Sequence, residues 1–171
     1  PIPWRWTCLA SVALAESIEE VHPELRPTIK WPNDVLLHDR KVAGILAEST
    51  WDGLHLAAVV GVGVNVNTDE AHLFEVGGAA TSLRVACGMH VSRGQLLHAF
   101  VDRVDAWLER PAAECFAAWQ ARLWGRGQRL RLVDLGSDEE VVVLGADLDG
   151  SLRVRRSDGT ERRTTTGELL G

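Results

Sequence analysis

The sequence predicts an α+β fold in which a mixed central sheet with helices on one face is followed by a small β-barrel. Residues 9–123 combine helix-period and strand-period apolar patterns, as expected for a sheet with covering helices. From residue 127 onward the chain holds short β-prone runs separated by turn signals. We therefore expect a larger domain over residues 1–124 and a small β-barrel domain over residues 127–171.

Three segments carry apolar residues at helical spacing. The first is Leu9–Val21, for which Thr7 is the predicted N-cap and a following proline marks the end. The second is Arg93–Leu108, which Ser92 is well suited to cap, and the third is Pro111–Leu123, with proline in its first turn. The apolar face predicted for the second helix consists of Leu96, Leu97, Phe100, Val104, Trp107 and Leu108.

The residues between the first and second helices have the pattern of a β-meander. The expected strands are Thr28–Trp31, Val35–Leu37, Lys41–Glu48 and Leu54–Val66. The last of these contains Gly61 and Gly63, and glycine inside a strand often marks a place where a ligand or another backbone comes close. Residues 68–80 follow as a loop with one helical turn, and order is expected to resume at Thr81.

After Trp124 the sequence changes from helix-period segments to short β-prone runs. The strands expected there are Arg129–Leu135, Glu140–Ala146, Ser151–Arg156 and Glu161–Thr165. Asp149-Gly150 and Asp158-Gly159 lie between β-prone runs, and Asp-Gly dipeptides are strong hairpin signals. Asp147 and Asp149 do not predict a calcium loop, because such a loop needs further acidic residues and a terminal glutamate at set positions.

Composition excludes several classes of function. The chain has 171 residues, a net charge of −6 and a pI near 5.5, whereas general nucleic-acid binders are usually basic. No apolar run reaches the roughly 18 residues that a membrane-spanning helix needs. Cys8, Cys87 and Cys115 are far apart and the histidines are scattered, so neither a metal site nor a disulfide framework is expected. This cysteine usage fits a reducing cytoplasm.

A cationic stretch is the strongest candidate for a functional site. It runs from Lys30 through the Asn33-Asp34 turn and continues at Lys41. Lysines presented from rigid strands beside a turn suit a substrate that carries negative charge. Two plainer interpretations stay open: Asn33-Asp34 can be an ordinary turn, and Asp34 can pair with either lysine without carrying any chemistry.

A second candidate is the glycine- and asparagine-containing run at residues 61–67. It begins like a dinucleotide-binding fingerprint, but Val66 stands at the third glycine position and no helix obviously follows, which argues against a Rossmann fold. Asn65 can be a strand-end amide satisfied by backbone groups. It can also read an adenine edge through its paired donor and acceptor, and the residues alone do not choose between these interpretations.

The combination of these motifs is more specific than any one of them. Lys-Trp-Pro-Asn-Asp stands at residues 30–34, Arg-Lys-Val-Ala-Gly-Ile-Leu-Ala-Glu at 40–48 and Gly-Val-Gly-Val-Asn-Val-Asn at 61–67. In this order and spacing, with Ala-Thr-Ser-Leu at 80–83 and the helices and strands that follow, they resemble the catalytic core of bacterial biotin protein ligases. The resemblance implies a class II synthetase-like ligase core, N-terminally incomplete, and an SH3-like barrel.

The resemblance further implies a two-step reaction in the cytoplasm, with ATP and biotin as substrates and Mg²⁺ as cofactor. The carboxylate of biotin attacks the α-phosphate of ATP and forms biotinyl-AMP. A lysine of a biotin carboxyl carrier protein then attacks this mixed anhydride. Negative charge gathers at the phosphate and carboxyl oxygens in both steps, and a fixed lysine would stabilise it.

Individual roles also follow from the resemblance. Lys41 would contact the biotin carboxyl and the adenylate phosphate, while Asp34 and Asn33 would organise the phosphate, magnesium or the incoming lysine. No metal ligand is assigned beyond Mg²⁺ near Asp34, and residues 68–80 would order over the adenylate. The residues that would line the biotin site, besides Lys41, are Gly44, Ile45, Gly61 and Gly63. The residues that would bind the nucleotide are Lys30, Asn65 and Asn67.

The sequence departs from the family near its first residues. The family carries a Gly-Arg-Gly-Arg loop and a Ser/Thr-containing biotin segment before the first helix, and the residues given contain neither, since Gly125-Arg126-Gly127 only echoes that loop. We therefore expect catalysis to require a further N-terminal region. The alternatives are a catalytically inactive ligase-like remnant and, less favoured, a relative of lipoate-protein ligases. DNA and membranes are not expected partners, and dimerisation through the central sheet, common among bacterial relatives, stays open.

Overall fold

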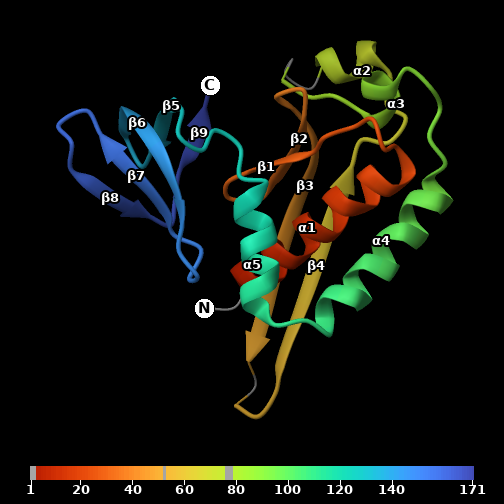
Figure 1. Cartoon of the computed structure of the whole chain (residues 1–171), viewed down its shortest axis with the longest axis horizontal. Helices are drawn as coiled ribbons and strands as arrows, with labels where there is room; N and C mark the ends of the chain where they lie inside the picture. Colours follow the sequence, from red (N-terminus) through yellow and green to blue (C-terminus); the bar gives the residue numbers. More distant parts are fainter. Residues whose placement is uncertain (1–2, 52, 76–78) are drawn as a thin grey trace.

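The computed structural model describes residues 3–51, 53–75 and 79–171 of the chain. It contains two antiparallel sheets, and a layer of helices covers one face of the first (Figure 1). The helices are α1 (Pro3–Val21), α2 (Glu70–Glu75), α3 (Leu83–Cys87), α4 (Arg93–Leu108) and α5 (Ala112–Ala121). The predicted α+β class is confirmed. No helix in the described part of the chain combines the length and the apolarity needed to cross a membrane.

Helix α1 is the main cover of the first sheet. It contacts all four strands of that sheet and packs against both α4 and α5. The chain is already helical at Pro3, because Trp4 and Trp6 extend the apolar face that packs on the core. The prediction of Thr7 as N-cap was therefore wrong. The buried residues of α1 are mainly small or branched, which permits close packing: Leu9, Val12, Ala13, Leu14 and Ile18.

The first sheet is a meander, as predicted. Its strands are β1 (Thr28–Lys30), β2 (Asp34–Leu37), β3 (Arg40–Trp51) and β4 (Leu56–Val64). They are hydrogen-bonded in chain order, and every pair is antiparallel. Among the described residues, parallel pairing is confined to two isolated bridges, Ile29 with Leu123 and Lys41 with Ala80. The mixed character predicted for this sheet is limited to those two contacts.

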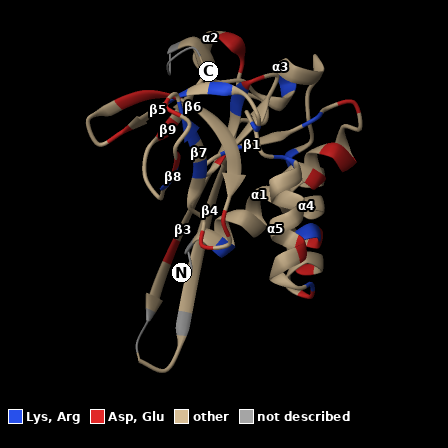
Figure 2. Ribbon diagram, turned by 60° about the vertical axis from the view of Figure 1, so that its left-hand side comes forward, with Lys and Arg blue, Asp and Glu red and all other residues tan. Residues whose placement is uncertain are grey.

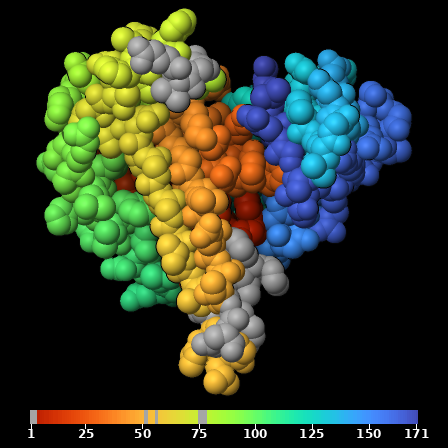
Figure 3. Space-filling view, turned by 180° about the vertical axis from the view of Figure 1, so that it is seen from behind, coloured from red at the N-terminus to blue at the C-terminus, as the bar shows by residue number. Residues whose placement is uncertain are grey.

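Strands β3 and β4 form a long hairpin that projects beyond the helices (Figure 1). Strand β4 contains no charged residue (Figure 2). Neighbouring residues of a strand point to opposite faces, so the side chains of Ala43 and Ile45 enter the core under α1 while Gly44 and Leu46 belong to the other face. Leu46 is 63% exposed there. Seen from behind, β3 and β4 are not covered by helices (Figure 3).

The segment between the sheets is more helical than the sequence suggested. Helix α2 occupies part of the predicted loop, whose residues 76–78 lie outside the described residues. Helix α3 was not predicted; it begins after Ser82, whose Oγ accepts a hydrogen bond from the N–H of Val85 at 3.1 Å. Helix α4 has the predicted bounds and cap. Leu97 and Leu108 are 61% and 50% exposed, so their assignment to its buried face was wrong, because the apolar stripe is wider than the surface it packs on.

The second sheet follows α5, and one of its faces packs into the hydrophobic core shared with the helices. Its strands are β5 (Arg129–Asp134), β6 (Ser137–Ala146), β7 (Leu152–Arg156), β8 (Glu161–Thr164) and β9 (Glu168–Leu170). The pairing order is β8-β7-β6-β5-β9, all antiparallel, and the sequence did not predict β9. A barrel was predicted, whereas the pairings of residues 127–171 form an open order that does not join β8 to β9.

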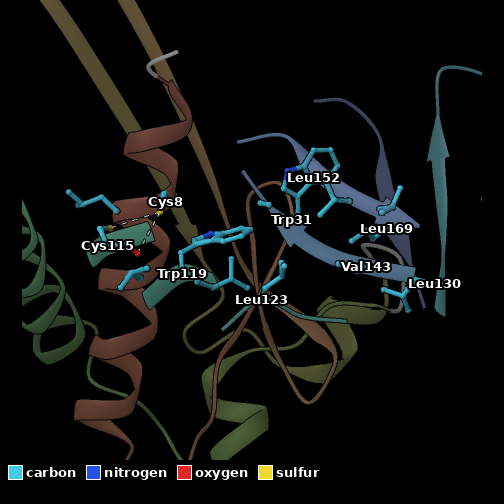
Figure 4. Packing of buried hydrophobic residues seen from close by; sticks show 14 of the residues in the cluster. Cys8, Trp31, Cys115, Trp119, Leu123, Leu130, Val143, Leu152 and Leu169 are labelled. Carbon is cyan, nitrogen blue, oxygen red and sulfur yellow. Dashed lines mark hydrogen bonds between the residues drawn. The ribbon is translucent and has the colours of Figure 1, made fainter. Parts of the chain in front are cut away.

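One hydrophobic core joins the helices to the second sheet (Figure 4). Trp31, which is 1% exposed, donates from Nε1 to the carbonyl of Gly150 at 2.9 Å. The backbone of Ile29 bonds to Arg122 and Trp124, so the residues after α5 run along β1. Helix α5 thus ends at Ala121, slightly before the predicted end. The chain then continues along the edge of the first sheet. Buried members of this core from the second sheet include Leu130, Leu132, Val143, Leu152 and Leu169.

Candidate functional site

Lys41 and Asp34 form an ion pair on neighbouring strands of the first sheet. Asp34 begins β2 and Lys41 lies near the start of β3, and the distance from Nζ to Oδ1 is 2.6 Å. The side chain of Asp34 is 16% exposed and that of Lys41 is 48% exposed, so the lysine stays open to solvent. Of the two pairings that the sequence left open for Asp34, the structure shows the one with Lys41.

Gly44 makes room for this ion pair. It lies opposite Asp34 in the register of β2 and β3. A Cβ atom at this position would lie 3.2 Å from Lys41 Nζ and 3.5 Å from Asp34 Oδ1. The first of these contacts is tighter than normal, so a side chain here would displace the lysine. Glycine at this position therefore leaves the space that the Lys41 side chain occupies.

A strip of glycine extends from the ion pair across the uncovered face of the sheet. Gly63 is paired with Gly44, and Gly61 is paired with Leu46, so the three glycines share one face. A Cβ atom at Gly61 or Gly63 would meet nothing closer than a carbonyl oxygen at 3.8 or 3.9 Å. The backbone of β3 and β4 is thus bare beside Lys41, and an apolar ring system could lie flat against it.

Asn33 fastens the turn before β2 to β3. Its Nδ2 donates to the carbonyl of Ile45 at 2.9 Å, and the N–H of Ile45 donates to the carbonyl of Asn33 at 2.9 Å. Ile45 itself is 1% exposed and packs in the core with Val35 and Leu37. In this structure Asn33 holds the turn that presents Asp34, and the side chain of Ile45 faces the helices.

Asn65 and Asn67 bind the backbone of the segment that follows β4. Asn65 Nδ2 donates to the carbonyl of Thr81 at 3.1 Å. The amide of Asn67 donates to the carbonyl of Val91 at 2.8 Å and accepts from its N–H at 2.9 Å. The backbone of Lys41 also bonds to this segment, through its carbonyl to the N–H of Thr81 at 2.7 Å. Both asparagines therefore brace the segment that holds Lys41.

Lys30 forms an ion pair with a residue of the second sheet. Its Nζ lies 3.0 Å from Oε1 of Glu168, the first residue of β9, and its side chain is 15% exposed. Lys30 is also paired with Asp34 in the register of β1 and β2, so it stands one strand away from the Lys41 pair. A cavity of about 430 Å³ opens between these groups. Its walls include Lys30, Asp34, Lys41, Trp124, Glu168 and Leu170.

The structure adds three site residues that the sequence did not single out: Asp39, Trp124 and Glu168. Glu168 pairs with Lys30, and Trp124 donates from Nε1 to Oδ1 of Asp39 at 2.8 Å. All three line the cavity beside Lys41. No local pattern signals these contacts, because 138 residues separate Glu168 from Lys30 and 85 separate Trp124 from Asp39. Recognition of β9 would have been the first clue, since its pairing with β5 carries Glu168 to this edge.

Metal-binding groups of protein side chains are sparse in this site. Across residues 3–51, 53–75 and 79–171, no cluster of three or more His, Cys, Asp or Glu side chains is arranged to hold a metal ion. Asp147 and Asp149 face arginines instead, with Arg163 at 2.7 and 2.8 Å from their carboxylates. The site therefore offers fixed cationic groups and a bare strand surface, which suit an anionic ligand with an apolar part.

Comparison with known proteins agrees with this description. The model of the biotin/lipoate A/B protein ligase family matches residues 5–65. The bifunctional ligase/repressor BirA of Bacillus subtilis is 30% identical over 171 residues, which covers 96% of this chain and 52% of that protein. The biotin--[acetyl-CoA-carboxylase] ligase of Mycobacterium tuberculosis is 32% identical over 162 residues, covering 88% of this chain and 56% of that protein. The chain is similar in sequence to biotin protein ligases.

The fold also matches solved biotin protein ligases. The apo structure of the Aquifex aeolicus ligase superimposes with a TM-score of 0.80 at 24% identity, over 97% of this chain and 73% of that chain. This likeness confirms the fold, including the arrangement of the two sheets. The chain spans about half the length of the curated relatives it matches.

Proposed function

We propose that this chain carries the lysine side of the active site of a biotin protein ligase. The protein would attach biotin to a lysine of a biotin carboxyl carrier protein, using ATP and forming biotinyl-AMP. The observation that carries the proposal is the position of Lys41 at one end of a glycine strip on the uncovered sheet face. A cation beside a bare apolar surface matches a substrate with one carboxylate and an apolar ring system.

Lys41 is the central residue of the proposed mechanism. A lysine carries three donors, and Asp34 accounts for the one carboxylate contact described for Nζ. The remaining donors can bind the carboxylate of biotin and the α-phosphate oxygens as the carboxylate oxygen attacks phosphorus and pyrophosphate leaves. In the second step Lys41 would stabilise the charge on the carbonyl oxygen while the acceptor amine attacks and AMP leaves. Asp34 holds the lysine in place, and Asn33 holds the turn of Asp34.

The biotin rings would lie on the strip formed by Gly44, Gly61 and Gly63. The strip needs no rearrangement to receive them, because no side chain covers it from within the pair of strands. Ile45 would contribute the backbone next to Gly44, while its side chain supports the strand from the core. An apolar ligand on a preformed surface loses little free energy to reorganisation.

The nucleotide would bind between the two sheets. Lys30 would add positive charge to the phosphates across the cavity from Lys41, and Glu168 would hold Lys30 there. Asn65 would contact the adenine edge and Asn67 would support it. The Nδ2 of Asn65 would then donate to the base in place of the Thr81 carbonyl. Mg²⁺ would bind near Asp34, because Asp34 and Asp39 both line the cavity and this ion takes one or two carboxylates plus substrate phosphates. When bound, Mg²⁺ neutralises phosphate charge.

Substrates and partners of related proteins support the same assignment. The Aquifex aeolicus ligase has been solved in complex with biotin and ATP, and it shares the fold of this chain. The Mycobacterium tuberculosis relative acts on acetyl-CoA carboxylase by name. We place the reaction in the cytoplasm, because Cys8, Cys87 and Cys115 are free thiols in the structure. A dimer formed through the central sheet is part of the proposal, whereas DNA binding is not.

The test is a transfer assay with the complete gene product and with residues 1–171 alone. Each is incubated with ATP, Mg²⁺, a biotin carboxyl carrier domain and either biotin or lipoate, and the acceptor is weighed by mass spectrometry. We expect biotin transfer by the complete product and little by residues 1–171, because these contain no Gly-Arg-Gly-Arg loop. Lipoate transfer in place of biotin, or no transfer by either protein, would overturn the proposal.

A further inference from the structure

Two buried cysteines from distant parts of the chain lie together. Cys8 is in the second turn of α1 and Cys115 is in the first turn of α5, and their sulfur atoms are 4.0 Å apart (Figure 4). Both are free thiols, 4% and 6% exposed. Their separation of 107 positions hides the pair from any inspection of sequence spacing. The cysteines are far apart in the sequence, and the fold brings these two together.

A small cavity gives these thiols a route to solvent molecules. Its volume is about 140 Å³, and both cysteines line it. Arg5 and Arg110 also line it, and the guanidinium of Arg110 stacks 4.7 Å above the ring of Trp107. A space of this size is several times the roughly 30 Å³ that one water molecule takes up, so it admits hydrogen peroxide but not a peptide-sized disulfide. Any oxidant that reaches the sulfur atoms must be small.

The two thiols differ in acidity. A hydrogen bond from the Cys8 S–H lowers the pKa of Cys115, an effect that Arg5 reinforces and that burial and the charge of Glu16 oppose. The same hydrogen bond, together with burial, raises the pKa of Cys8. Thiolates rather than thiols are nucleophiles, so these directions favour Cys115 as the attacking sulfur. This order is that of an attacking and a resolving cysteine.

We propose that Cys8 and Cys115 form a dithiol site that hydrogen peroxide converts to a disulfide between α1 and α5. The Cys115 thiolate attacks one peroxide oxygen, the O–O bond breaks, and the departing hydroxide takes a proton to leave as water, with Cys115 as sulfenic acid. The Cys8 sulfur then attacks the Cys115 sulfur, the S–O bond breaks, and the hydroxyl leaves as water with the proton of Cys8. In sum, two thiols and one peroxide give one disulfide and two waters.

The geometry permits this bond with small movements. A disulfide is about 2.05 Å long, so each sulfur must move by about 1 Å from the present separation. The helices are in direct contact along this line. Cys87 serves as an internal reference, because it is half-buried and its sulfur donates to the carbonyl of Met89. The proposal is independent of the ligase reaction, since it concerns only the packing of α1 on α5.

The experiment treats the folded chain with one equivalent of hydrogen peroxide, then alkylates free thiols and maps peptides by mass spectrometry. We expect the chain to lose the mass of two hydrogen atoms, Cys87 to be alkylated, and a cross-linked peptide to join Cys8 and Cys115. Reduction should restore all three thiols. Cys87→Ser should behave like the wild type. A cross-link through Cys87, or oxidised cysteines without a link between Cys8 and Cys115, would overturn the proposal.

The order of reaction is tested separately. With Cys8→Ser, a sulfenic-acid probe such as dimedone should label Cys115, whereas with Cys115→Ser it should leave Cys8 unlabelled. Labelling of Cys8 instead would contradict the assigned roles. If either variant fails to fold, the wild type decides the matter: the specific cross-link should form in the native chain and lose its selectivity in urea. Equal selectivity in urea would remove the native cavity from the explanation.

Discussion

In the first sheet Lys41 and Asp34 pair beside a cavity, whereas in the second sheet Asp134 and Arg162 pair beneath neighbouring hydroxyl groups. Both pairs are 2.6 Å apart. Asp134 is 6% exposed and also accepts hydrogen bonds from Thr166 at 2.7 Å. Lys41 is 48% exposed and faces bare backbone on its other side.

The difference separates a stabilising pair from one that can act. Asp134 has its oxygens occupied by Thr164, Thr166 and Arg162, and the hydrogen bond from Thr166 is the largest cause that lowers the pKa of this carboxyl. Such a group has little capacity left for a ligand. Lys41 keeps donors for an incoming anion, because Gly44 and Gly63 leave its surroundings open. Equal distances thus give no measure of function; the unused donors do.

The largest effect is expected from Lys41→Ala in the complete gene product. Loss of a fixed donor at developing negative charge should reduce biotinyl-AMP formation by about 10²–10³-fold. Pyrophosphate release measures this step, and circular dichroism checks the fold. The matched control is Arg129→Ala on the second sheet, whose pair with Glu140 is exposed and 3.6 Å apart, so the rate should not change. An unchanged rate with Lys41→Ala would remove the distinction between the two sheets.

The junction between the sheets is tested by Trp31→Phe. This change removes the donor to the Gly150 carbonyl, and a buried acceptor without its partner costs about 1–3 kcal/mol of unfolding free energy. Trp119→Phe is the control, because Trp119 is fully buried and its Nε1 has no hydrogen-bond partner among the described residues. Urea unfolding should show Trp31→Phe to be the less stable variant. The reverse order would mean that the bond does not tie the sheets together.

Gly44→Ala should have an intermediate effect. The added methyl group would lie 3.2 Å from Lys41 Nζ, so the lysine must move, and we expect roughly a tenfold loss in biotinyl-AMP formation, equal to about 1.4 kcal/mol. Gly94→Ala is the control, since a Cβ there would meet only Ser92 Oγ at 3.9 Å. That helical position should retain the rate and gain slight stability. Equal rates for both variants would show that Lys41 tolerates crowding.

The smallest effect concerns pH. The pKa of Asp134 is lowered in the folded state, so its contribution is complete above the unfolded value of about 3.9 and disappears as the pH falls through the lower folded value. The stability difference between wild type and Asp134→Asn should therefore shrink below about pH 4. Asp138→Asn provides the comparison, because Asp138 pairs with Arg131 at the exposed surface and salt should remove its contribution. If the stability difference between wild type and Asp134→Asn stays constant below about pH 4, the ionised Asp134 carboxylate does not stabilise the fold.

Much of the fold could be predicted from local patterns. The meander of β1–β4 follows from apolar runs and turns, and α4 has the predicted bounds because Ser92 caps it as expected. The errors lie where distant contacts decide the outcome. Strand β9 is only three residues long and exists because it pairs with β5, and Leu97 is exposed because α1 covers only part of α4. Short elements carry too little local information to be recognised alone.

The sequence by itself determined the order of the motifs, and with it the resemblance to biotin protein ligases and the proposal for Lys41. Chain order and residue type suffice for this, because the strand pairs that bring Asp34, Lys41 and Gly44 together are adjacent in sequence. Only the tertiary structure decided which carboxylate holds which lysine, with Glu168 on Lys30 and Asp34 on Lys41. It also brought Cys8 to Cys115. Contacts across more than a hundred residues depend on how the helices and the second sheet pack, and no local pattern records that packing.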